Sequence, residues 1–312
     1  MTISQQISEQ NDTTALDSTI TSSVGIIGLG AMGGSVAHRL VTAGFQTFVR
    51  DLDPAAVARL TDEGASTMTD ESVASLEVVF TSLPDDRTLR AAVLESGLLS
   101  QLRGKILIDL STTLPSTIEE IAEEAVAHDV RVIDSPVSGG PPEARDGRLV
   151  LMVGASDADL DVAKPFLDAI GIVQHVGGVG KGKAIKIVNN TMAMGNVAVA
   201  VEAFALGRKL GLDAQRLYDV INQSGGRSFH FSKRIPYVLD RDLSPRFALY
   251  LAEKDLRLAL TVAHDSAFAM PAAGAIHQIF EAARAKGLGQ LDSVALIKLY
   301  EDMAGIDAAG SD

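Results

Sequence analysis

The sequence contains no cysteine. This excludes disulfide bonds, thiolate metal sites and cysteine nucleophiles together, and it is typical of a reducing compartment. No apolar run is long enough to cross a membrane as a helix. The histidines show neither the H-E-x-x-H motif nor another paired spacing, so we expect no metal site. These absences predict a protein that has no membrane partner and no metal.

Basic residues are in the minority, with 27 Lys and Arg against 40 Asp and Glu and a net charge of −13. An acidic surface repels phosphate backbones, and no local basic stripe offsets it, so we expect no nucleic-acid partner. Hydrophobic residues make up 46% of the 312 residues and charged residues 21%, which predicts a globular chain with a sizeable core.

Residues 1–23 are rich in Ser, Thr, Gln and Asp and contain no Lys or Arg. They have neither the basic start and apolar stretch of a secretory signal nor the arginines of a transit peptide. We therefore expect a disordered tail and a cytoplasmic protein.

Short apolar runs alternate with helical patterns from residue 24 to residue 183. The runs predict strands at 24–27, 46–49, 78–81, 105–109, 131–133, 149–153 and 172–173. Helical stretches lie between them, as at residues 31–43, 115–128 and 157–169. This alternation predicts a Rossmann-type, doubly wound α/β domain with a mainly parallel sheet over residues 24–183.

The pattern changes near residue 182, and no convincing strand follows. A long helix is predicted from 184 to 210, with further helices at about 214–223, 247–264, 272–286 and 293–302. Residues 184–312 are therefore expected to form an all-α C-terminal domain, joined to the first domain by the long helix. This domain is rich in Ala and Leu, so we expect a homodimer or homotetramer.

A G-x-G-x-x-G motif follows the first strand and opens the first helix. Its residues are Gly28, Leu29, Gly30, Ala31, Met32 and Gly33. The first glycine permits a tight turn, the second lets the backbone approach a pyrophosphate, and the third lets helix and strand pack closely. Asp51 ends the second strand, where a carboxylate binds ribose hydroxyls and repels a 2′-phosphate. The motif thus predicts NAD, with NADP less favoured; Arg50 would favour NADP if it turned inward.

Two further strands end in polar loops. Leu83 and Pro84 follow the strand at 78–81, and Thr112 follows the strand at 105–109. Ligands of doubly wound sheets bind at the carboxyl ends of the strands, so these residues are candidates for cofactor contacts. A helix cap before Pro115 is the alternative role for Thr112.

The remaining candidates point to a substrate site. Ser138, Gly139 and Gly140 offer a hydroxyl and unhindered N–H groups to a carboxylate, with a simple Gly/Pro turn as the alternative. Lys186 and Asn190 are spaced i, i+4 on one face of the linking helix. A lysine among apolar neighbours can have a lowered pKa and act as a general acid or base. Lys181 and Lys183 are rivals, although neither pairs with an amide one turn on.

Four segments in register carry a family resemblance: GLGAMG at 28–33, DSPVSGG at 134–140, GKGKAIKIVNN at 180–190 and KDL at 254–256. With them the chain resembles the β-hydroxyacid dehydrogenases, which include 3-hydroxyisobutyrate dehydrogenase, over about residues 24–302. The resemblance implies reversible NAD(P)-linked oxidation of a small 3-hydroxy acid and a helical domain that assists dimerisation.

The same resemblance assigns roles to single residues. It implies that Lys186 is the catalytic lysine, that Asn190 holds the substrate beside it, and that residues 138–140 bind the carboxylate. It also implies that Lys254 lies near the nicotinamide and that Thr112 contacts the cofactor. An ion pair on the helix surface is the alternative role for Lys254.

The chain departs from the family pattern at Arg39, at Val36 and over residues 226–231, so the substrate beyond its carboxylate is left open. His230 and Arg246 are possible pocket residues. Two alternatives to the dehydrogenase are an imine reductase of the same fold, which usually lacks a lysine at position 186, and a non-catalytic dinucleotide-binding protein.

Overall fold

The computed structural model describes residues 22–305. The tail expected over residues 1–23 lies outside this range except for Ser22 and Ser23, and Ser23 already begins the first strand. Within the described range, no helix combines the length and the apolar character needed to cross a membrane.

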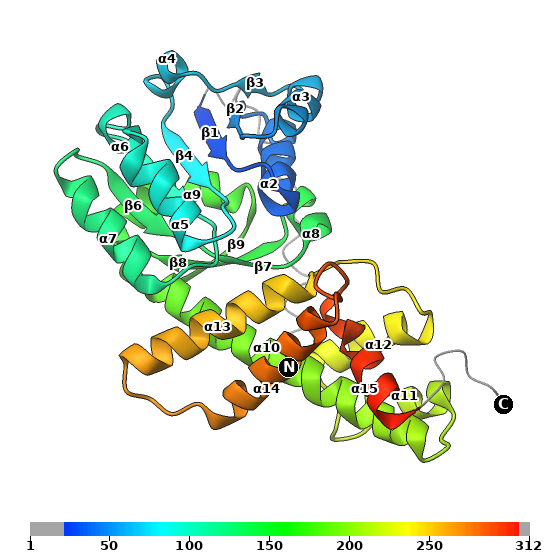
Figure 1. Ribbon diagram of the computed structural model, residues 1–312. Coiled ribbons are helices and arrows are strands. Elements are labelled where there is room, and N and C mark those ends of the chain that lie inside the picture. Colours follow the sequence, from blue (N-terminus) through cyan, green and yellow to red (C-terminus); the bar gives the residue numbers. More distant parts are fainter. Residues whose placement is uncertain (1–21, 306–312) are drawn as a thin grey trace, which may run out of the picture.

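The first half of the described chain is one sheet covered by helices (Figure 1). Its strands are β1 (Ser23–Ile27), β2 (Gln46–Arg50), β3 (Ser66–Thr67), β4 (Val78–Thr81), β5 (Ile106–Asp109), β6 (Arg131–Asp134), β7 (Val137–Ser138), β8 (Leu149–Gly154) and β9 (Gly171–Gly177). They lie in the order β3-β2-β1-β4-β5-β6-β8-β7, and β9 pairs with β8. The strands from β3 to β6 are parallel, whereas β8 runs antiparallel to β6 and β7. This confirms the expected Rossmann-type, mainly parallel sheet.

Both faces of the central strands β1, β4 and β5 are buried, and side chains that alternate along each strand enter the core on opposite faces. In β4, Val78 and Phe80 join one hydrophobic cluster, and Val79 joins the cluster on the opposite face. The helices that cover the sheet are α2 (Ala31–Thr42), α3 (Pro54–Asp62), α4 (Asp70–Val73), α5 (Asp86–Arg90), a π-helical turn (Ala91–Glu95), α6 (Leu98–Gln101), α7 (Pro115–Val126), α8 (Pro141–Arg145) and α9 (Asp157–Asp168). After β1 the chain adds β2 and β3 on one side of β1 and then crosses over to add β4 on the other side. The carboxyl ends of β1 and β4 therefore form the switch point, where ligands of such sheets bind.

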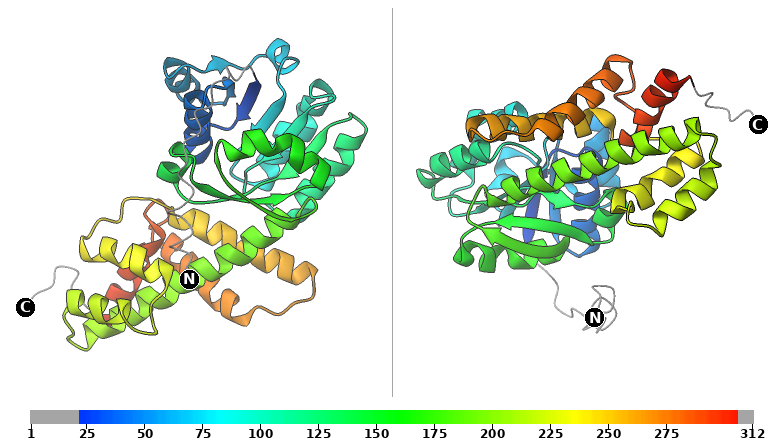
Figure 2. Two further views of the ribbon diagram at one scale, coloured as in Figure 1. Left: turned by 180° about the vertical axis from the view of Figure 1, so that it is seen from behind. Right: turned by 90° about the horizontal axis from the view of Figure 1, so that it is seen from below.

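The second half is helical, as the sequence predicts. Its elements are α10 (Lys181–Lys209), α11 (Ala214–Asn222), α12 (Phe229–Leu239), α13 (Leu249–Asp265), α14 (Pro271–Ala285), a 3₁₀ turn (Ser293–Ala295) and α15 (Leu296–Ala304). Helix α10 leaves the sheet and runs on as the spine of this part, with α13 beside it (Figure 2). It begins three residues before the expected start, so the domain division expected between residues 183 and 184 falls within its first turn.

Helix α12 is the one long helix that the sequence does not predict. Ser228 caps it by accepting the Phe231 N–H at 3.0 Å. Pro236 lies inside it and has no N–H to donate to the carbonyl of Ser232. The hydroxyl of Tyr218 on α11 donates to that carbonyl at 3.1 Å instead. A tertiary contact therefore allows a helix that the local pattern disfavours.

Candidate active site

In the glycine turn between β1 and α2, two glycines have no room for a side chain, whereas the third has open space beside it. A Cβ on Gly28 would lie 2.4 Å from the Ser82 carbonyl oxygen, and one on Gly33 would lie 1.9 Å from the Gly28 carbonyl oxygen. A Cβ on Gly30 would meet no atom within 4 Å. No side chain caps α2, and its first turn has no acidic residue, so its N–H groups can bind an anion. The open space at Gly30 beside these donors fits a dinucleotide pyrophosphate.

Asp51 follows β2 and lies against this turn. One oxygen of its carboxylate accepts the Leu29 N–H at 2.5 Å, and the other accepts the Asp53 N–H at 2.8 Å. The guanidinium of Arg50 pairs with Asp70 of α4 at 2.9 Å. The carboxylate is thus held beside the glycine turn, and the neighbouring arginine is paired with another acid.

A groove of about 500 Å³ opens next to the same turn. It is lined by Gly30 and Ala31 and also by Arg59 of α3 and Arg145 of α8. Neither arginine has a hydrogen bond or ion pair with another residue of the described chain. Guanidinium groups beside an uncapped helix N-terminus suit a phosphate-bearing ligand.

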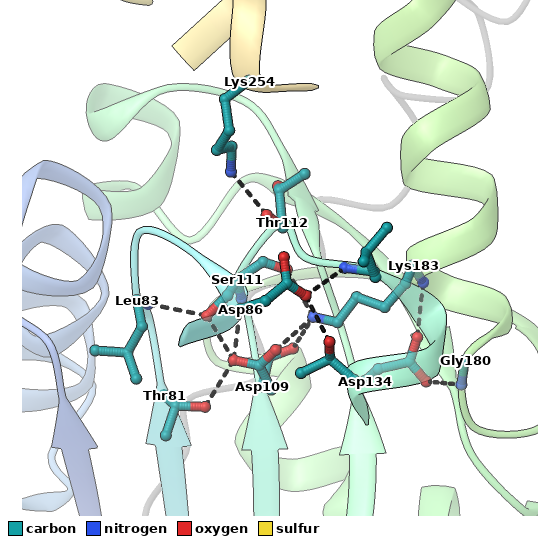
Figure 3. Close-up of polar contacts among 12 residues, drawn as sticks. Thr81, Leu83, Asp86, Asp109, Ser111, Thr112, Asp134, Gly180, Lys183 and Lys254 are labelled. Carbon is teal, nitrogen blue, oxygen red and sulfur yellow. Dashed lines mark hydrogen bonds and ion pairs between the residues drawn. The ribbon is translucent and has the colours of Figure 1, made fainter. Parts of the chain in front are cut away.

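The buried carboxylate of Asp109 joins the carboxyl ends of β4 and β5 (Figure 3). Its Oδ1 atom accepts the hydroxyls of Thr81 at 2.7 Å and Ser111 at 2.6 Å. The hydroxyl oxygen of Ser111 in turn accepts the Leu83 N–H at 2.9 Å. The loops that carry Leu83 and Thr112 are therefore fixed to each other.

Two residues tie the first turn of α10 into this network. The carboxylate of Asp134, at the end of β6, accepts the N–H groups of Gly180 at 2.8 Å and Lys183 at 2.7 Å. Burial raises the pKa of Asp134, although Lys183 and the two N–H donors oppose the shift. The ammonium of Lys183, fully buried, lies 2.5 Å from Asp109 Oδ2. This cap also explains why α10 begins earlier than the sequence predicts.

Lys186 lies one turn further along α10 and has different surroundings. Its side chain is buried, with 9% of the residue exposed. Its amine has no hydrogen bond or ion pair with any residue between 22 and 305. Burial lowers the pKa of Lys186 to about 8, while Asp255 acts to raise it and the charges of Lys254 and Lys183 act to lower it. Such an amine can accept and donate a proton near neutral pH.

Asn190 shares the buried face of α10 with Lys186, as their spacing predicts. Its Nδ2 donates to Asp255 Oδ2 of α13 at 2.5 Å, and its Oδ1 accepts from Asn189 Nδ2 at 3.0 Å. Asp255 Oδ1 is buried without a hydrogen bond, 3.3 Å from the ammonium of Lys254. The amide of Asn190 is thus held in one orientation, with one N–H not used by Asp255.

Lys254 connects the helical part to the carboxyl ends of β4 and β5, which form the predicted cofactor edge of the sheet. Its ammonium donates to the carbonyl of Thr112 at 2.7 Å (Figure 3). It also donates to the carbonyl of Pro84 at 3.2 Å. Three of the predicted cofactor residues therefore meet at one place, at the ends of β4 and β5.

The predicted carboxylate loop runs from β7 to the start of α8. The Gly140 N–H donates to Glu143 Oε2 at 2.8 Å, which lowers the pKa of that carboxyl. Lys233 of α12 lies 3.6 Å from the other oxygen of Glu143. The hydroxyl of Ser138 makes no hydrogen bond within the described residues. One donor of the loop is thus already used inside the protein, which the sequence does not reveal.

His230 and Arg246 have partners within the helical part. Burial lowers the pKa of His230 to about 4, so its ring is neutral at neutral pH, and Arg234 lies 3.4 Å from Nδ1. Arg246 stacks over the ring of Tyr237 at 3.8 Å and pairs with Asp242 at 2.5 Å. These contacts account for both side chains without a ligand.

A cluster on α13 and α14 contains three groups of the type that binds metals. Glu253, His277 and Glu281 place one possible ligand atom each within 4.8 Å of one another. Glu253 is paired with His277 at 3.0 Å and with Arg257 at 3.4 Å. The guanidinium of Arg257 therefore offsets the charge of the buried carboxylate, and the contacts among these side chains explain the cluster.

Comparison with known proteins identifies the family. The sequence profile of the NAD binding domain of 6-phosphogluconate dehydrogenase matches residues 23–178. A second profile, the NAD-binding part of NADP-dependent 3-hydroxyisobutyrate dehydrogenase, matches residues 180–300. A 2-(hydroxymethyl)glutarate dehydrogenase of Eubacterium barkeri is 36% identical over 298 residues, which cover 92% of this chain and 97% of the relative. The chain belongs to the β-hydroxyacid dehydrogenase family.

Other β-hydroxyacid dehydrogenases agree with this assignment. An L-threonate dehydrogenase of Cupriavidus necator is 34% identical, over 89% of this chain and 95% of the relative. The structure of 3-hydroxyisobutyrate dehydrogenase from Mycobacterium tuberculosis with L-serine has a TM-score of 0.83 and 30% identity, and it covers 90% of this chain and 99% of that one. This β-hydroxyacid dehydrogenase is thus an oxidoreductase of a family that acts on small hydroxy acids with a nicotinamide dinucleotide.

Three residues of this β-hydroxyacid dehydrogenase contribute to the site but are not identified from the sequence. Asp255 lies in the KDL segment, of which only the lysine is singled out. Glu143 follows the glycines of the predicted loop by three residues. Lys183 is considered only as a rival to Lys186, because its partners lie more than 70 positions away in the sequence.

Proposed function

We propose that the chain catalyses the reversible, NAD-linked oxidation of a 3-hydroxy carboxylic acid, with Lys186 as the general acid and base. The observation that carries this proposal is the amine of Lys186, which is buried, has no partner within the described chain and lies one turn before Asn190. A buried amine without a partner is suited to accept a proton from a bound ligand.

The residues present fit the dinucleotide. The glycine turn and the uncapped start of α2 would hold the pyrophosphate, while Leu83, Pro84, Thr112 and Lys254 would surround the nicotinamide end. We favour NAD over NADP because Asp51 lies where a 2′-phosphate would be repelled and because Arg50 is paired with Asp70. When bound, the nicotinamide ring accepts or supplies the hydride.

The chain's own residues would handle the substrate and the proton. The hydroxyl of Ser138 and the backbone at Gly139 and Gly140 would bind the carboxylate, with the Gly140 N–H shared with Glu143. The remaining N–H of Asn190 would orient the alcohol oxygen. Neutral Lys186 would accept the hydroxyl proton at Nζ during oxidation, and its ammonium would return it during reduction.

The relatives indicate which acids to test first. The names of two enzymes, 2-(hydroxymethyl)glutarate dehydrogenase and 3-hydroxyisobutyrate dehydrogenase, describe acids whose hydroxyl lies on the carbon β to a carboxylate. A panel of such acids with methyl, hydroxymethyl, polyol, carboxyethyl and sulfonate groups, each with NAD and with NADP, tests the proposal by absorbance at 340 nm. We expect turnover of at least one acid, with higher kcat/KM for NAD.

The same panel distinguishes the alternatives. Cyclic imines with NADH and NADPH are added, together with NADH binding by fluorescence. Imine reduction without acid oxidation would support an imine reductase, and cofactor binding without any turnover would support a non-catalytic protein. Either result would contradict the proposed function.

A further inference from the structure

Lys183 is a buried charged residue to which the proposed chemistry gives no role. None of its surface is exposed, and its ammonium donates to Asp109 Oδ2 at 2.5 Å, to the Ser111 carbonyl at 2.6 Å and to the Asp109 carbonyl at 3.2 Å. A lysine ammonium has three donors, so all of them are used. Lys183 therefore has no donor left for a substrate, and its function must lie in what it holds.

Lys183 holds the loop that follows β5. Asp109 and Ser111 are the two residues whose backbone carbonyls it binds, and Thr112 is the next residue (Figure 3). The other oxygen of Asp109 binds Thr81 and Ser111, so the same contacts reach the end of β4. One ammonium from the first turn of α10 thus fixes the ends of two strands at the cofactor edge.

A second lysine binds the same loop from the other side. Lys254 of α13 donates to the carbonyl of Thr112 at 2.7 Å, next to the Ser111 carbonyl that Lys183 binds. Lys183 also lies three residues before Lys186, on the same buried face of α10. The loop that would contact the nicotinamide is therefore attached directly to the turn that precedes the proton-transfer group.

We propose that Lys183 is a positioning residue for hydride transfer: its ammonium fixes residues 110–113 against the first turn of α10, so that Thr112 and Lys186 keep one relative placement. This inference rests on the proposed function. Misplacement of reacting groups by about 1 Å can cost about 10²-fold in rate, so a loss of this contact should be visible in turnover.

Three variants separate positioning from stability. Lys183→Met with Asp109→Asn removes the contact without leaving a buried charge unpaired. Asp109→Asn alone keeps the bonds of Lys183 to the two carbonyls. Lys181→Met is the matched control, because it removes an exposed lysine from the same helical turn.

The first measurement is hydrogen–deuterium exchange in the protein without cofactor. We expect faster exchange over residues 110–114 in the double variant and unchanged exchange in Lys181→Met. The second measurement is kcat with its primary deuterium isotope effect, using the acid that the unmodified chain oxidises best. We expect kcat to fall about 10-fold or more in the double variant, with a larger isotope effect and a Kd for NADH within about fivefold. Asp109→Asn should lose less activity than the double variant.

Unchanged kcat and isotope effect in a folded double variant would overturn the inference. Failure of both Asp109 variants to fold would also overturn it, because the contact would then serve the fold itself. If the unmodified chain oxidises no acid, the proposed function fails instead, and the exchange data still show whether Lys183 holds the loop.

Discussion

Lys183 and Lys186 lie three residues apart on the same face of α10, and both are buried. The ammonium of Lys183 has three acceptors, whereas the amine of Lys186 has none within the described chain. The difference shows that burial alone does not determine the role of a lysine. Lys183 uses all its donors to hold other residues, whereas the amine of Lys186 is available to a ligand.

The charge of Lys183 also affects the pKa of Lys186. Burial lowers the pKa of Lys186 to about 8, and the positive charge of Lys183 contributes to the lowering. The carboxylate of Asp255 acts in the opposite direction. The fixed charge of one lysine therefore helps to keep the other partly neutral near physiological pH.

The largest effect is expected from Lys186→Ala. General acid–base catalysis is worth about 10²–10⁴-fold, so kcat should fall by this factor while the Kd for NADH stays within about twofold. Steady-state kinetics and NADH fluorescence measure the two quantities. Lys181→Ala, which removes an exposed lysine of the same helix, should keep both unchanged. Wild-type turnover in Lys186→Ala would show that the amine without partners is not the proton carrier.

A smaller loss is expected from Asn190→Ala, which removes the amide beside Lys186. A lost buried hydrogen bond costs about 1–3 kcal/mol, so kcat/KM should fall about 10- to 100-fold. Asn189→Ala is the control, since Asn189 is exposed and only supports the orientation of Asn190. Equal losses in the two variants would mean that Asn190 does not contact the substrate.

The smallest effect is a shift in pH dependence from Asp255→Asn. Asp255 raises the pKa of Lys186, so its neutralisation should lower that pKa further. In the proposed reaction neutral Lys186 accepts the proton during oxidation, and the ascending limb of the kcat profile should therefore move to lower pH. Asp265→Asn, an exposed change on the same helix, should leave the limb in place. A shift to higher pH would contradict the electrostatic account.

The sequence predicts most of the fold because its strands are short apolar runs and its helices are strongly periodic. Helix α12 is the long helix that is missed, since Pro236 argues against a helix and the compensating hydroxyl of Tyr218 comes from another element. Short elements such as β3, β7 and α8 are missed as well, because two to five residues carry little periodicity. At the site, the spacing of Lys186 and Asn190 predicts their common face. The partners of Lys183 do not follow from spacing. Asp109 ends β5, and it contacts Lys183 only because the strands assemble in the observed order.

The pH dependence of single-turnover hydride transfer, measured from pH 6 to pH 11 in both directions, tests the role of Lys186 most directly. The pKa of about 8 predicts that oxidation rises with pH around a midpoint near 8 and that reduction falls over the same range. A profile without a limb in this range, or one whose midpoint lies at the usual lysine pKa of about 10.4, would contradict the account.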